Sequence, residues 1–324
     1  MKVERYISNN QLMLDELQNQ IETTSFKLDL EHAVIEKDLY VTEIIHTVIP
    51  IEHDYYRLIF QGGTCLAKAH KIIPRMSEDC DFRIEMKPAA FNFSREKVRN
   101  ELRDFRHKIL KHLQETGFVI EQDKVRVRNE GKFISMRLQY ESLYEKRLAL
   151  KPFLAIDFFL AEVKMPTIAL PVTTLVRNTL GDVVKHPEKN ITCISLIETA
   201  AEKWIGLTRR IATIKYRPSY NDPALVRHLY DLLKIKRAIE LNAEFTRLVK
   251  RIIEIEKAQF KNHNDNYFVN PCEEIKTAIE FLTLSQEWRN NWHRFVHDMV
   301  FEVNPPDYDE ALNEFKELLF LALR

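Results

Sequence analysis

Glycine and cysteine are both scarce in this chain of 324 residues, which has 6 glycines and 4 cysteines. The cysteines are Cys65, Cys80, Cys193 and Cys272. They are widely scattered and form no Cys-x-x-Cys pair, which argues against a zinc site or a disulfide framework and favours a reducing compartment. Because glycine is so rare, the adjacent pair Gly62-Gly63 indicates a position where the backbone conformation requires glycine, rather than a flexible linker.

The sequence also lacks long uncharged runs and an excess of either charge. No apolar run approaches the length that crosses a bilayer, and the N-terminus shows no signal-peptide core. The chain has 48 lysine and arginine residues and 48 aspartate and glutamate residues. Its net charge therefore gives no indication of nucleic-acid binding. We expect a cytoplasmic protein with no membrane partner. Any RNA contact must come from local basic clusters, at 95–111, 124–137 and 209–217, although such clusters often form only a solvated surface.

Two short motifs point to phosphate chemistry. The apolar run 55–60 predicts a buried strand that ends at Gly62-Gly63-Thr64, where backbone N–H groups are open to a polyphosphate. Asp79 and Asp81 are two residues apart, so on a strand their carboxylates share a face. Such like charges repel unless a cation lies between them, and oxygen ligands favour magnesium. Each motif alone is common in turns and exposed strands, but together they predict phosphoryl or nucleotidyl transfer.

A third carboxylate stands in an unusual place. The run 153–160 predicts the most apolar strand of the chain, and Asp157 is its only charge. Burying a lone carboxylate is costly unless a cation or a partner compensates it. Asp157 is therefore a candidate metal ligand, and the alternative is an aspartate that caps a turn or pairs with an arginine.

The hydrophobic pattern predicts an α+β protein of two lobes. Helices are expected at 12–21, 31–48, 64–70 and 95–114, with a β-hairpin at 124–138 around Asn129-Glu130-Gly131. Beyond Pro166 and Pro171 the strand signals fade. Helices are then expected at 196–208, from Pro223 to about 240, and at 243–259, 272–284, 287–299 and 308–323. The expected domains are 1–165 and 166–324. Trp288, Trp292 and Phe295 share one helix face, which is typical of core packing.

Four ordered segments resemble a known family. The stretch 60–82 is similar to the first motif of the AbiEii/AbiGii-type nucleotidyltransferases, toxins of bacterial toxin–antitoxin and phage-defence modules that include MenT-like toxins. The family pattern is Gly-Gly-Ser/Thr, a helix, then Arg-x-Ser-x-Asp-hydrophobic-Asp-Phe, and only Cys80 departs from it. The segments 35–42, with Glu-Lys-Asp, 197–210, with a helical lysine, and 227–232, with Arg-His-x-Tyr-Asp-Leu, resemble three further family motifs.

The resemblance implies a fold and a set of site residues. It implies an N-terminal DNA polymerase β-like nucleotidyltransferase lobe with a mixed sheet, and an all-helical lobe that completes the NTP cleft. The phosphates would bind at Gly62, Gly63 and Thr64, supported by Arg75 and Ser77. Magnesium would bind at Asp79, Asp81 and Asp157.

The same resemblance assigns roles in the helical lobe to residues that look ordinary in sequence. Lys203 would contact the triphosphate, Asp231 would orient it or the nearby basic groups, and Arg227 and His228 would adjoin the site. His228 could act as a general base. A structural or binding role is preferred, because transfer to RNA depends chiefly on activation of the hydroxyl by the metal.

The implied activity is magnesium-dependent transfer of NMP from an NTP to an RNA 3′ end, with the tRNA acceptor end favoured. Translation would then be blocked, and a cognate antitoxin would neutralise a toxin that is expected to be monomeric. Two alternatives remain open from the sequence: transfer of NMP to a protein hydroxyl, and a non-catalytic nucleotide-binding module.

Overall fold

A computed structural model describes residues 11–144, 150–184, 186–259, 267 and 269–322. The chain divides into two compact units. The first, which we call the sheet unit, comprises Met1–Lys71, Met76–Val163 and Thr167–Ile194. The second, the helical unit, comprises Ile72–Arg75, Lys164–Pro166 and Ser195–Arg324.

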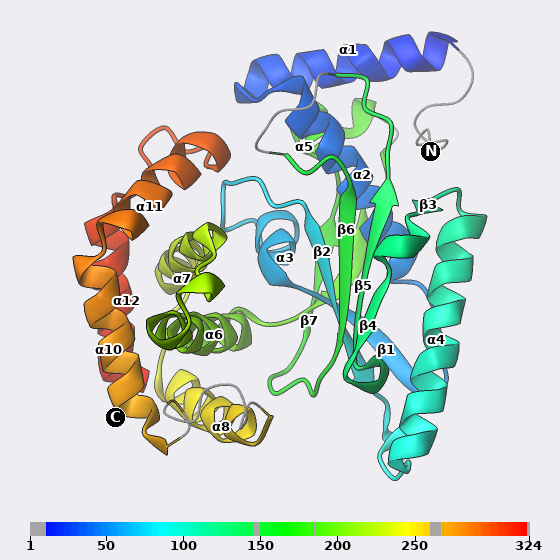
Figure 1. Ribbon diagram of the computed structural model, residues 1–324. Coiled ribbons are helices and arrows are strands. Elements are labelled where there is room, and N and C mark those ends of the chain that lie inside the picture. Colours follow the sequence, from blue (N-terminus) through cyan, green and yellow to red (C-terminus); the bar gives the residue numbers. More distant parts are fainter. Residues whose placement is uncertain (1–10, 145–149, 185, 260–266, 268, 323–324) are drawn as a thin grey trace. The chain divides into compact units, whose positions relative to one another are not determined.

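The sheet unit contains an eight-stranded mixed sheet in the described residues (Figure 1). Its strands are β1 (Tyr56–Gln61), β2 (Asp79–Met86), β3 (Val119–Ile120), β4 (Arg126–Arg128), β5 (Phe133–Gln139), β6 (Leu154–Leu160), β7 (Ile168–Val172) and β8 (Lys189–Cys193). Their order is β3-β5-β6-β2-β1-β8-β7, and β4 also pairs with β5. The β1–β8 and β2–β6 pairs are parallel and the others are antiparallel. The predicted α+β class and hairpin are confirmed.

Helices of the same unit bury apolar residues against the alternating core positions of the strands. They are α1 (Gln11–Leu28), α2 (His32–Val48), α3 (Gly62–Lys68), α4 (Arg95–Glu115) and α5 (Leu175–Leu180). Ile44 of α2 and Phe105 of α4 join one core with Phe82 and Phe158 of the central strands. The predicted cap of α4 is present, because the Ser94 side chain accepts a hydrogen bond from the backbone N–H of Lys97.

The expectation that helical periodicity replaces strands beyond Pro166 is wrong for residues 168–193, which form β7, α5 and β8. Proline weakens a strand signal because it has no N–H to donate to the ladder. In the described part of the chain, β7, which contains Pro171, lies at one edge of the sheet and pairs only with β8. Edge strands are where proline is tolerated.

The helical unit follows the predicted pattern closely. Its helices are α6 (Leu196–Tyr216), α7 (Val226–Ala238), α8 (Ala243–Gln259), α10 (Pro271–Leu284), α11 (Gln286–Met299) and α12 (Tyr308–Ala322). Ser195 caps α6 as expected. Trp288, Trp292 and Phe295 are buried, which confirms core packing. The predicted last position of α12, residue 323, lies outside the described residues. No helix in the described ranges is long and apolar enough to cross a membrane.

Candidate active site

Three carboxylates are aligned on neighbouring strands of the sheet unit. Asp79 and Asp81 lie on β2, and Asp81 is in direct parallel register with Asp157 on β6. Cys80 and Phe82, which alternate with the aspartates, are fully buried in the core on the opposite face. Alternation therefore directs all three carboxylates to the other face of the sheet. Asp157, which the sequence singled out as a lone charge, lies on the strand adjacent to the Asp-x-Asp strand.

Gly62 is the point where the backbone approaches this cluster. Its φ is +81°, and a Cβ atom placed there would lie 2.2 Å from Oδ2 of Asp81. Only glycine satisfies both the left-handed backbone and the contact with the carboxylate. The predicted requirement for glycine in the backbone is thus found at Gly62, whereas Gly63 has no positive φ.

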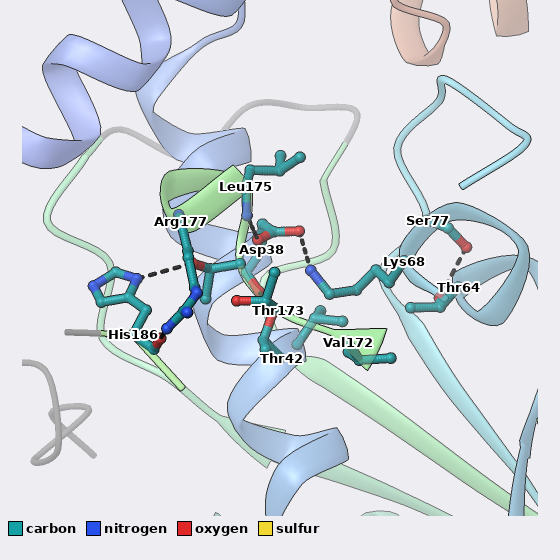
Figure 2. Close-up of polar contacts among 12 residues, drawn as sticks. Asp38, Thr42, Thr64, Lys68, Ser77, Val172, Thr173, Leu175, Arg177 and His186 are labelled. Atoms are coloured by element: carbon teal, nitrogen blue, oxygen red, sulfur yellow. Dashed lines mark hydrogen bonds and ion pairs between the residues drawn. The ribbon is translucent and has the colours of Figure 1, made fainter. Parts of the chain in front are cut away.

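Thr64 and Ser77 join α3 to the beginning of β2. The Thr64 hydroxyl is buried and donates to the carbonyl oxygen of Asp79 at 2.5 Å. It also lies 2.9 Å from the Ser77 hydroxyl (Figure 2). Both hydroxyls therefore make contacts that hold the strand bearing the aspartates. The donors that remain for a phosphate are the backbone N–H groups at the start of α3, which have no partner within a helix.

Lys151 is a site residue that the sequence did not reveal. Its Nζ atom lies 2.5 and 2.6 Å from the two carboxylate oxygens of Asp79, and both side chains are partly exposed. Burial, followed by the negative charge of Asp79, raises the pKa of Asp157 against the opposing effects of a Ser135 hydrogen bond and of Lys151. The neighbouring carboxylates therefore favour a positive charge beside them, which Lys151 supplies. No sequence motif surrounds Lys151, so its role emerges only from the fold.

The donor set fits magnesium. Among the described residues, no group of three or more histidine, cysteine, aspartate or glutamate side chains is placed so that it could hold a metal ion by itself. Magnesium does not require one, because it binds through one or two carboxylates completed by substrate phosphates and water. Asp79, Asp81 and Asp157 carry hard oxygen atoms on one face of the sheet, and the ammonium of Lys151 lies beside Asp79.

The Glu-Lys-Asp motif of α2 contacts the segments that carry the carboxylate cluster and Lys151. Lys37 is fully buried and donates to the carbonyl oxygens of Lys151 and Phe153, both at 2.7 Å. It also lies 3.4 Å from Glu78, which accepts a hydrogen bond from the backbone N–H of Lys151 at 3.0 Å. Lys37 and Glu78 together fix the backbone that carries Lys151.

The neighbouring residues of the motif hold other segments. Asp38 pairs with Lys68 at the end of α3 and accepts from the backbone N–H of Leu175 at 2.7 Å (Figure 2). Glu36 accepts from the backbone N–H of Leu143 at 2.7 Å. Three consecutive buried charges thus bind three separate segments, which explains a motif to which the sequence alone gave no role.

The helical unit brings together Arg75, Lys203 and Asp231. Arg75 makes a bidentate contact with Asp231 at 2.8 and 2.9 Å, and Lys203 lies 2.9 Å from the same carboxylate. Burial alone would raise the pKa of Asp231, but the charges of Arg75 and Lys203 outweigh it and hold this pKa well below its usual range. Sequence reasoning placed Arg75 beside the phosphates or the metal strand, whereas its guanidinium binds Asp231.

His228 on α7 adjoins the same group. Its Nδ1 lies 3.4 Å from Nζ of Lys203, and its Nε2 lies 3.4 Å from a guanidinium nitrogen of Arg210. Burial and these two positive charges lower the pKa of His228 well below its ordinary value. The imidazole is therefore neutral at physiological pH.

A family model matches most of the chain. The family model of the AbiEii nucleotidyl transferase toxin, from type IV toxin–antitoxin systems, matches residues 47–314. Among solved structures, MenT4, a nucleotidyltransferase toxin from Mycobacterium tuberculosis H37Rv, is 14% identical, covers 93% of this chain and 98% of its own, and has a TM-score of 0.47. No curated protein sequence matches the chain.

Proposed function

This chain belongs to the AbiEii family of nucleotidyl transferase toxins of type IV toxin–antitoxin systems, and from this premise we propose that it transfers NMP from an NTP to an RNA 3′-hydroxyl. The tRNA acceptor end is the favoured substrate. Its modification would arrest translation in the cytoplasm until a cognate antitoxin counteracts the toxin. The observation that carries the proposal is the register of Asp81 with Asp157, with Asp79 on the same face.

Asp79, Asp81 and Asp157 would hold magnesium. When bound, the ion would polarise the triphosphate and favour ionisation of the acceptor hydroxyl. The chain itself fixes the donors, because Gly62 lets the Asp81 carboxylate approach the backbone and Thr64 holds the beginning of β2. Backbone N–H groups of Gly63 and Thr64 would donate to triphosphate oxygens.

Lys203 would neutralise charge on the triphosphate. Asp231 orients its ammonium, and Arg75 holds Asp231 in turn by two parallel hydrogen bonds. Burial and the neighbouring cations lower the pKa of His228 and make its imidazole a poor proton acceptor, so we assign it the role of positioning Lys203 rather than that of a general base.

Two rivals make different predictions. Transfer to a protein hydroxyl would use the same NTP site and differ only in the acceptor. A non-catalytic nucleotide-binding module would not need three carboxylates on one face of the sheet, two of them in register, so their presence favours turnover. Exposed basic side chains on α4 and β4 favour RNA over protein as the acceptor.

The test is incubation of the protein with each α-labelled NTP, magnesium and either total RNA or a protein extract. We expect label at RNA 3′ ends with the wild type and none with Asp81→Asn. Glu85→Gln, which removes a carboxylate from the far end of the same strand, is the matched control and should retain transfer. Label in protein would support the first rival, and NTP binding without transfer would support the second.

A further inference from the structure

The sheet face that carries the carboxylates continues beyond the proposed metal ligands. Asp157 is opposite Ser135 on β5, and Ser135 is opposite Arg126 on β4. Paired residues on adjacent strands point to the same face, and a hydrogen bond from Ser135 to Asp157 agrees with this. A single row, Asp81–Asp157–Ser135–Arg126, therefore crosses four strands from the proposed metal ligands to an arginine at the sheet edge. Figure 1 shows the four strands, β2, β6, β5 and β4.

Aromatic rings lie on this face beside the row. Phe133 on β5 is opposite Phe159 on β6, and their ring centroids are 5.0 Å apart. Each ring is two residues from a member of the row, a step of about 6.6 Å along a strand. Both rings are half-buried, whereas Ile134 and Met136, which face the core, are almost completely buried.

The arginines at the edge carry uncompensated charge. Arg126 and Arg128 are exposed, and neither makes an ion pair or side-chain hydrogen bond within the part of the chain that the structure describes. Arg128 is opposite Phe133 and also lines a groove of about 450 Å³ with Arg99, Arg103 and Arg106 of α4. Two basic clusters far apart in sequence thus meet at one edge.

We propose that this face, defined by Arg126, Arg128, Phe133 and Phe159, binds the single-stranded 3′ segment of the acceptor RNA. Guanidinium groups without partners bind phosphates, and aromatic side chains on an open sheet stack with unpaired bases. A protein partner would favour a larger apolar centre than the half-buried rings of Phe133 and Phe159 provide. This inference rests on the proposed RNA-directed function and adds where the acceptor lies.

The spacing suits a nucleotide chain that enters the site from the edge. Arg126 is two strands from Asp157, or about 10 Å at the usual separation of paired strands. A stacked strand rises about 3.4 Å per nucleotide, so Arg126 would meet the phosphate about three nucleotides from the reacting 3′ end. Phe133 and Phe159 would contact bases of that segment.

Binding without turnover provides the test. The probe is a fluorescein-labelled RNA stem–loop with a four-nucleotide 3′ overhang, titrated in the absence of NTP, beside the same stem–loop with a blunt end. We expect the wild type to prefer the overhang. Arg126→Glu/Arg128→Glu should weaken its binding roughly tenfold or more and reduce the salt dependence, since about two phosphate contacts are lost. Phe133→Leu should weaken it roughly tenfold through loss of stacking.

Two control variants test whether a loss of RNA binding depends on the position of the substitutions, rather than on the change in net charge or on impaired folding. Arg247→Glu/Lys250→Glu on the exposed side of α8 makes the same change in net charge, and Val127→Thr alters β4 on the opposite face. Both should bind RNA as the wild type does, and melting temperatures of all variants should agree within a few degrees. The KM for RNA should rise in the face variants while the KM for NTP stays unchanged.

The results distinguish an incorrect RNA-binding face from an incorrect proposed function. If the wild type labels RNA but the face variants keep its affinity and KM for RNA, the acceptor lies elsewhere and the inference is overturned. If the face variants instead lose binding to the antitoxin and keep RNA binding, the surface belongs to a protein partner. If the wild type binds RNA on this face but transfers NMP to no RNA, the proposed function is overturned while the binding site stands.

Discussion

The Nζ atom of Lys151 lies 2.5 and 2.6 Å from the two carboxylate oxygens of Asp79, so an ammonium occupies one side of the carboxylate cluster. The backbone of Lys151 is held independently by Lys37 and Glu78, which fixes the origin of the side chain. A magnesium ion bound at the proposed site would compete with this ammonium for the same lone pairs of Asp79. Lys151 would therefore stabilise the carboxylates in the absence of metal and oppose the binding of metal.

Lys151→Met should raise the affinity for magnesium by about two- to fivefold, the range expected when a partly exposed ion pair is removed. The metal-free protein should melt at a lower temperature, because the carboxylates lose their counter-charge. Both effects are measured together by thermal unfolding over a magnesium titration. Lys132→Met, at an exposed lysine of the same unit, is the control. Weaker magnesium binding in Lys151→Met would show that the lysine assists the metal rather than competing with it.

The two adjacent glycines should respond differently to alanine. Gly62→Ala places a Cβ at positive φ and 2.2 Å from the Asp81 carboxylate, so we expect a loss of about 1–2 kcal/mol in unfolding free energy and at least tenfold in kcat. Gly63→Ala adds a good helix former where φ is not positive. It should keep or slightly increase stability and should raise the KM for NTP if phosphate approaches this backbone.

Chemical denaturation and steady-state kinetics of the two variants separate these effects. The more disruptive Gly63→Val should weaken NTP binding further in calorimetry. Full activity of Gly62→Ala would show that the position of the Asp81 carboxylate is not critical.

Elements with strong local signals were predictable from sequence. The strand ending at Gly62, the Asp-x-Asp strand and the caps at Ser94 and Ser195 depend on residues close together in the chain, and the structure contains all of them. The pairing of Lys203 with Asp231 was also expected, although there the family motifs supplied the information that local pattern could not.

What escaped prediction depends on contacts between distant residues. Arg75 binds a carboxylate 156 positions away, and no local pattern reveals which of many acids a basic residue meets. Lys151 reaches Asp79 only because β6 pairs with β2. The strand containing Pro171 is stable because it lies at the sheet edge, a property of topology rather than of sequence.

The buried group of Arg75, Lys203 and Asp231 should show strongly non-additive mutant effects. Asp231→Asn leaves two buried cations without a counter-charge and should cost about 3–5 kcal/mol of stability. Lys203→Met leaves the bidentate Arg75 contact intact, so activity should fall sharply with a much smaller loss of stability. The double variant should be more stable than Asp231→Asn and no less active than the worse single variant.

Denaturant midpoints measure the change in stability, and kcat/KM for NTP measures the change in activity. Lys234→Met is the control, because Lys234 is a comparably buried lysine whose partner is Glu302. Strictly multiplicative losses of activity would contradict the view that Lys203 and Asp231 act as one unit.

His186 should make the stability of the sheet unit sensitive to acid. Its Nδ1 makes a hydrogen bond with the Thr174 hydroxyl, and the two atoms are 2.8 Å apart. Burial, partly opposed by the charge of Asp38 and assisted by that of Arg177, lowers the pKa of His186 to about 4. The unfolded chain, with a pKa near 6.5, therefore binds an extra proton between these two pH values.

Stability contributed by neutral His186 is fully present above about pH 6.5 and is lost as the pH falls toward 4, by up to about 3 kcal/mol. His186→Asn keeps a hydrogen-bonding side chain beside Thr174 but cannot titrate, so its unfolding free energy should fall less steeply than that of the wild type between pH 7 and 4.5. Urea unfolding at several pH values gives the difference curve. His107→Asn, at an exposed histidine of α4, should follow the wild type. Parallel curves for the wild type and His186→Asn would mean that His186 does not stay neutral in the folded protein.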